Sequence, residues 1–103
     1  MPNISLTGTA LEDEPDHYWL NLYEDKTAWM AEGSPPGNQI SRTKTGKWVH
    51  KTMPDKGVYA LDSSGEVVFF FRDLNPGTDT VGKQGNGHAH ESGRNISWRI
   101  DSL

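Results

Sequence analysis

One stretch, residues 57–72, constrains the fold more than any other, because two strand-like apolar runs are joined there by an obvious turn. Residues 58–61 form the first run and residues 67–71 the second. The residues that follow the first run, Asp-Ser-Ser-Gly at positions 62–65, suit a tight turn, since Asp and Ser side chains bond their own backbone and Gly accepts a positive φ. The stretch therefore predicts a β-hairpin against which the rest of the chain must pack.

The second run of this hairpin, Val-Val-Phe-Phe-Phe, has no polar face, which is typical of a central strand covered on both sides or by a partner. Other short segments alternate apolar and polar residues or lie between turn signals, as strands do. These segments are residues 3–7, 18–23, 39–43, 47–52 and 96–100. The pattern predicts an all-β fold, a single small antiparallel β-sandwich or barrel over one domain, 1–103. Residues 24–32 leave room for one short helix.

The core of such a domain must be thin. Hydrophobic residues make up only 33% of the 103 residues, but four Trp, three Tyr and three Phe concentrate the apolar area in large rings. Cysteine is absent, so disulfides and thiolate metal sites are excluded. Aromatic side chains are therefore expected to do most of the packing.

Charge and hydropathy exclude further classes. The net charge of −4 opposes binding to a phosphate backbone, so nucleic acid is an unfavoured partner. No apolar run approaches the roughly 18 residues of a membrane span, and no signal peptide is evident at the N-terminus. We expect a soluble chain and leave its location open. The acidic residues 12–16 are expected to form a solvated loop.

Residues 82–95 are rich in glycine and are predicted to form a loop, the kind of segment that often carries function. His88 and His90 would point the same way from an extended chain and could bind zinc or iron if Glu91 or a third His joined them. His-x-His after glycine also resembles the iron-binding tips of phage tail fibres, where three chains supply the imidazoles. Gly82 followed by His88-Ala89-His90 resembles the first half of the cupin metal motif, but the Glu expected a few residues later and the second motif are missing. We therefore predict neither a metal nor another cofactor.

The function that composition favours is binding of carbohydrate. Aromatic faces cover the apolar C–H patches of a sugar ring, and Asn, Gln and His satisfy its hydroxyls. We expect a neutral glycan to be bound by the glycine-rich loop and a nearby indole ring. The predicted ligand-binding residues are Trp48, Gln84, Asn86, His88, His90, Asn95 and Trp98.

An alternative comes from a resemblance. Residues 58–66, VYALDSSGE, the downstream Arg72 and residues 93–96, GRNI, resemble the ribonuclease domain of the colicin E3 and cloacin group. The resemblance implies a metal-independent ribonuclease in which Asp62, Glu66 and Arg94 have catalytic roles. The histidine of that family's turn has no counterpart here, so His88 or His90 would replace it. We lean towards a protein that is not an enzyme.

A third reading is a structural or decoration subunit of a phage or another symmetric assembly. A thin-cored acidic β domain with exposed aromatic side chains would suit a symmetric interface, and a homo-oligomer is then expected.

Overall fold

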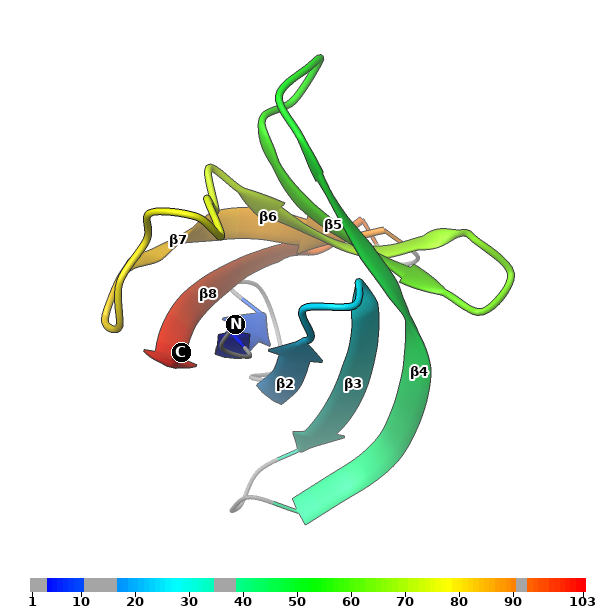
Figure 1. Ribbon diagram of the computed structural model, residues 1–103. Helices are drawn as coiled ribbons and strands as arrows, with labels where there is room; N and C mark the ends of the chain where they lie inside the picture. Colours follow the sequence, from blue (N-terminus) through cyan, green and yellow to red (C-terminus); the bar gives the residue numbers. More distant parts are fainter. Residues whose placement is uncertain (1–3, 11–16, 35–38, 91–92) are drawn as a thin grey trace.

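The computed structural model describes residues 4–10, 17–34, 39–90 and 93–103. All regular secondary structure within these residues is β-strand. The strands are β1 (Ile4–Ala10), β2 (His17–Leu22), β3 (Thr27–Ser34), β4 (Gln39–Lys51), β5 (Gly57–Asp62), β6 (Val67–Arg72), β7 (Gln84–Ala89) and β8 (Asn95–Ser102). Each strand pairs antiparallel with the next, and β8 pairs with β1 to close a barrel (Figure 1). The predicted all-β antiparallel fold is confirmed in its barrel form. The described residues contain no helix with the length and hydropathy that a membrane crossing requires.

The predicted hairpin is the pair β5 and β6, and β6 also pairs with β7. Phe69 and Phe71 belong to the interior cluster of the barrel. Phe70 points to the outer face, yet it is 0% exposed. The rings of Tyr59 and His88 cover it, with centroids 4.7 and 5.3 Å from its own. Both faces of this strand are therefore covered, as its unbroken apolar run predicts.

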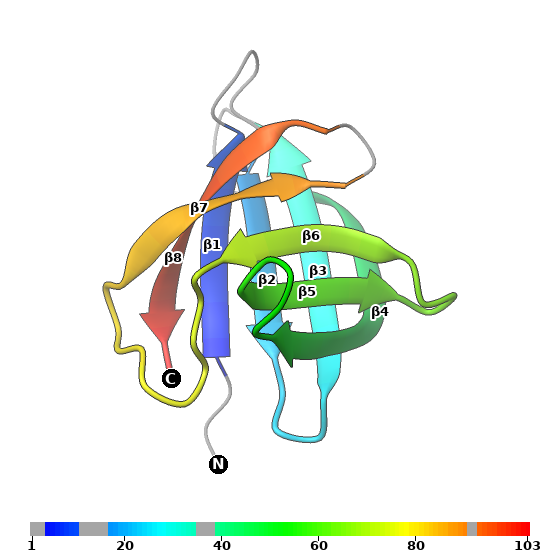
Figure 2. The same ribbon diagram turned by 90° about the horizontal axis from the view of Figure 1, so that it is seen from above.

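The longest strand, β4, turns the corner of the barrel. Two short strands are predicted in this region, but the structure has one strand of 13 residues. Its first part pairs with β3, and its second part, from Gly46 onward, pairs with β5. Figure 2 shows β5 and β6 running across the direction of β2 and β3, so β4 must bend between the two directions. A side chain at Gly46 would collide with the carbonyl oxygen of Leu61, which explains why glycine stands at the bend.

The short helix allowed for residues 24–32 is wrong, because most of that segment is strand β3. A turn precedes the strand, and Lys26 adopts a φ of 73° within it. The Asp25 carboxylate accepts hydrogen bonds from the backbone N–H and the hydroxyl of Thr27, at 3.0 and 2.6 Å. Pairing with β2 and β4 outweighs the weak helix propensity of nine residues. The acidic residues 12–16 lie outside the described part of the chain.

The predicted loop at residues 82–95 is also wrong, since its centre is strand β7, paired on both sides. Its glycines are needed for close packing. A methyl group at Gly85 would lie 2.7 Å from the Trp98 ring, and one at Gly87 would collide with the carbonyl oxygen of Phe70. The composition that suggested a mobile loop therefore reflects close contacts with neighbouring strands.

The interior of the barrel is filled mainly by large apolar side chains. The cluster comprises Tyr18, Leu20, Leu22, Ala28, Met30, Trp48, Val58, Ala60, Phe69, Phe71, Leu74, Ala89, Ile96, Trp98 and Ile100. The indole N–H groups of the two buried tryptophans both donate hydrogen bonds to backbone carbonyls. The N–H of Trp48 donates to the Tyr23 carbonyl at 2.8 Å, and that of Trp98 donates to the Asn86 carbonyl at 3.1 Å. This agrees with the expectation that aromatic rings do most of the packing.

The close contact between Gly85 and Trp98 can be tested by mutation. We expect Gly85→Ala to lower the free energy of unfolding by about 1–3 kcal/mol, because the added methyl group must displace the ring or the strand. Denaturant unfolding measures the change. Gly77→Ala is the matched control, since the nearest atom to its methyl group, Oδ1 of Asn75, would be 3.8 Å away. Equal stability of the two variants would contradict the packing described.

Candidate functional site

A groove with a volume of about 740 Å³ lies on the outside of the barrel. It lies where β3 and β4 meet the turn between β5 and β6. The residues that line it are Tyr23, Thr27, Ala28, Trp29, Thr45, Gly46, Lys47, Leu61, Asp62, Ser63, Ser64 and Gly65. We call this hollow the outer groove.

One side of the outer groove is aromatic. Trp29 on β3 and Tyr23 just after β2 are both partly exposed. Tyr23 is fixed by its backbone, since its N–H donates to the Thr27 carbonyl at 2.9 Å and its own carbonyl accepts the Trp48 indole N–H. The Lys26 ammonium lies 4.0 Å from the centre of the Trp48 ring. Trp48 therefore anchors the turn that carries Tyr23, although its own ring is buried.

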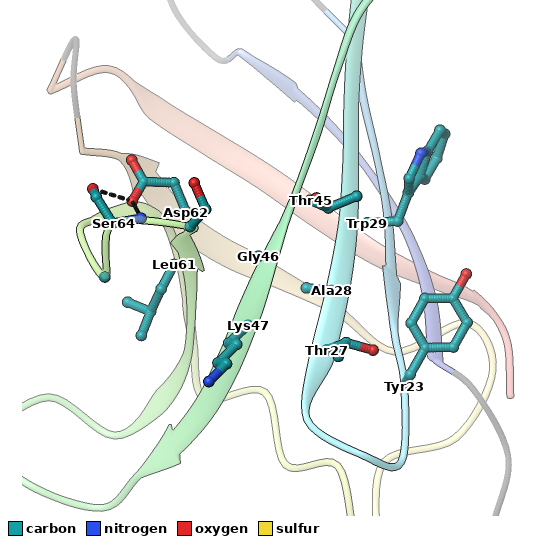
Figure 3. A pocket seen from close by; sticks show the side chains of 12 residues that line it. Tyr23, Thr27, Ala28, Trp29, Thr45, Gly46, Lys47, Leu61, Asp62 and Ser64 are labelled. Carbon is teal, nitrogen blue, oxygen red and sulfur yellow. Dashed lines mark hydrogen bonds between the residues drawn. The ribbon is translucent and has the colours of Figure 1, made fainter.

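The other side of the outer groove is the turn between β5 and β6. Oδ1 of Asp62 accepts three hydrogen bonds, from the Ser64 hydroxyl at 2.7 Å and from the backbone N–H groups of Ser64 and Glu66 at 3.0 Å each. In Figure 3, this turn lies on one side of β4, and the side chains of Trp29 and Tyr23 lie on the other side. All three bonds fall on Oδ1, so within the described part of the chain Oδ2 is left to accept from a ligand. The groove thus offers rings on one side and a rigid carboxylate on the other.

The Asp62 carboxyl has a pKa below its ordinary value, chiefly because the Ser64 hydroxyl donates to it, with further contributions from the Glu66 N–H and the charge of Lys44. It is therefore ionised at neutral pH. Lys47 is the cation that lines the same groove, so the charges of the lining side chains sum to zero. Hydroxyl groups of Thr27, Thr45 and Ser63 complete the polar lining.

Burial contradicts the predicted role of two ligand-binding residues as ring platforms. Trp48 is 5% exposed and Trp98 is 1% exposed, so neither ring can be a platform for a sugar. The reason is the two-residue period of a strand. In β8, Trp98 shares the inner face with Ile96 and Ile100, which are equally buried.

The predicted polar residues lie on the opposite face. Gln84, Asn86 and His88 alternate along β7 with Gly85 and Gly87, which abut Trp98 and Phe70, and His90 follows the strand. Gln84, Asn86, His90 and Asn95 are exposed, while His88 is partly covered through its contact with Phe70. None of these five polar residues lines the outer groove. The predicted convergence of this segment with Trp98 therefore does not occur.

The four residues of the ribonuclease prediction lie in different places. Asp62 and Glu66 flank the β5–β6 turn, where the carboxylate of Asp62 holds the turn together. His88 packs on Phe70, and Arg94 lines the second hollow, described below. In the ranges the structure describes, no three His, Cys, Asp or Glu side chains cluster as metal ligands would. No hollow described here joins the four residues.

Trp29 and Tyr23 are not among the residues that the sequence predicted to bind a ligand. In the short helix allowed for residues 24–32, Trp29 would face inward together with Ala28 and Met30. In β3 these three residues alternate, so Ala28 and Met30 are buried and Trp29 faces out. Residues 28–31, Ala-Trp-Met-Ala, are all apolar, so no alternation in the sequence shows which way Trp29 faces.

No protein-family model, curated protein or solved structure matches this chain at a significant level.

The rigid turn gives a test by titration. We expect Ser64→Ala to raise the pKa of the Asp62 carboxyl, because it removes the hydrogen bond that contributes most to lowering it. A pH titration of the side-chain carboxyl resonances by NMR measures this. Because the folded pKa lies below the unfolded value, the stabilisation is present above about pH 4 and is lost as the pH falls through the folded pKa.

Ser63→Ala, at the neighbouring position, is the control and should leave the Asp62 titration in place. An unchanged pKa in the Ser64 variant would show that the hydroxyl does not bond the carboxylate in solution.

Proposed function

We propose that this protein is a carbohydrate-binding module that holds a neutral oligosaccharide in the outer groove. The observation that carries the proposal is the partly exposed Trp29 in the same hollow as an ionised carboxylate and several hydroxyl groups. Sugars need both features, because their C–H faces are apolar and their rims carry hydroxyls.

The contacts would divide between the two sides of the groove. The rings of Trp29 and Tyr23 supply apolar faces for the C–H patches of one sugar unit. On the other side, Oδ2 of Asp62 would accept a hydrogen bond from a sugar hydroxyl, and Ser63 can donate or accept. Because these groups stand on either side of β4, a ligand of more than one unit fits them better than a single sugar.

The balance of charge supports an uncharged ligand. Lys47 and Asp62 are the charged side chains of the groove, and their charges cancel. A polyanion would require a net positive surface, and its binding would weaken steeply with salt. We expect the affinity for a neutral glycan to depend little on ionic strength.

The groove is also preformed. The Asp62 turn is held by its own hydrogen bonds, and the Tyr23 turn is held by the buried Trp48. A ligand therefore does not have to order these backbone segments when it binds, and less of the contact energy is lost to conformational entropy.

The proposal is tested by a glycan array followed by calorimetry on the best ligand. We expect Trp29→Ala to weaken binding about tenfold, or ~1.4 kcal/mol, because the ring platform is lost. Trp19→Ala is the matched control, since Trp19 is a partly exposed indole of neighbouring strand β2 that does not line the groove. Both variants should remain folded.

Two results would contradict the proposal. The first is an array that stays blank at high protein concentration. The second is a glycan whose affinity falls as much in Trp19→Ala as in Trp29→Ala, because the binding surface would then lie elsewhere on the barrel. The predicted homo-oligomer stays a prediction.

A further inference from the structure

The second hollow opens into the barrel interior at one mouth, with a volume of about 360 Å³. It exists because the ladder between β4 and β5 begins only at Gly46. The part of β4 before this residue pairs with β3 and curves away from β5 (Figure 1). Core side chains near the start of β6 are thereby left at the bottom of an opening. We call this hollow the barrel mouth.

The bottom of the barrel mouth is apolar. It is formed by Tyr18, Met30, Phe69 and Ala89, all of which belong to the interior cluster. The rings of Tyr18 and Phe69 meet edge to face, with centroids 4.9 Å apart. Val68 on β6 adds a partly buried aliphatic wall. An apolar group that entered the mouth would contact these side chains and leave water.

Among the residues that the structure describes, those at the rim of the barrel mouth carry a net positive charge, although the whole chain carries a net charge of −4. Three cationic side chains, Arg42, Lys44 and Arg94, and one carboxylate, Glu32, line it. Arg42 and Glu32 form an ion pair of 2.7 Å. The charges of these four described side chains sum to +2, and the charge of Lys44 also helps to lower the pKa of the Asp62 carboxyl.

We propose that the barrel mouth binds a small amphipathic anion, with its apolar body against Phe69 and Met30 and its anionic group at Lys44 and Arg94. The size of the hollow lies within the usual range for small-molecule sites. The combination of an apolar bottom and a net positive charge on the described rim residues favours a carboxylate with one apolar end over a neutral or cationic compound. The site shares no lining residue with the outer groove, so it does not rest on glycan binding.

The test uses a matched pair of probes, 1-naphthaleneacetate and its neutral counterpart 1-naphthaleneethanol, each titrated into the protein by calorimetry. Both carry the same ring system, so the difference in affinity reports the rim charges. We expect the carboxylate to bind at least tenfold more tightly, and this preference to shrink as salt is raised, because the rim is exposed to solvent.

Variants then locate the site. Lys44→Gln should weaken naphthaleneacetate binding about threefold, as an exposed ion pair would, and Lys44→Glu about tenfold. Lys47→Gln is the control, because it removes the same charge from the same strand but lies in the outer groove. Lys44 is exposed, so its substitution should leave the fold intact.

Three results would overturn the proposal: no saturable binding of naphthaleneacetate, equal affinity for the two probes, or equal losses in Lys44→Gln and Lys47→Gln. The first would mean that the mouth is closed to ligands in solution. The second would mean an apolar hollow without selection for charge, and the third a diffuse electrostatic effect.

Discussion

Closure of the sheet encloses an interior that side chains must fill. The rest of the structure depends on which side chains fill it. A chain that is only 33% hydrophobic fills it largely with rings. Trp98 shows the consequence most clearly. Its indole lies over Gly85, donates its N–H to the Asn86 carbonyl at 3.1 Å, and so joins β7 to β8 inside the barrel. Gly85 in β7 therefore leaves the space that the ring of Trp98 in β8 occupies.

The bend of β4 at Gly46 creates both candidate sites. On the outer side it brings Trp29 into the same hollow as the Asp62 turn. On the inner side it separates the first part of β4 from β5 and opens the barrel mouth beside Lys44. The two hollows differ in charge, since the first is balanced and the second positive. One bend thus gives a small domain two surfaces of different chemistry.

The sequence predicted the fold class because its strongest signals were local. The Asp62 turn and the unbroken apolar run that contains Phe70 each specify structure within a few residues. Strands β3 and β7 were missed because tertiary contacts decide them. A glycine such as Gly85 suggests a loop when the ring that it contacts is not known. Trp29 faces inward if its segment has the period of a helix and outward if it has the period of a strand. Trp98 was expected to be a platform for a sugar for the same reason, since only the register of β8 shows that Trp98 faces inward.

The division of the four tryptophans into a buried pair and an outward pair underlies both the packing of the barrel and the outer groove. Hydrogen exchange of the indole N–H groups, followed by NMR, tests it most directly. Trp48 and Trp98 donate to backbone carbonyls inside the barrel, so their signals should exchange slowly with water. Those of Trp19 and Trp29, which are partly exposed, should exchange fast. Fast exchange of the Trp98 signal would contradict the account.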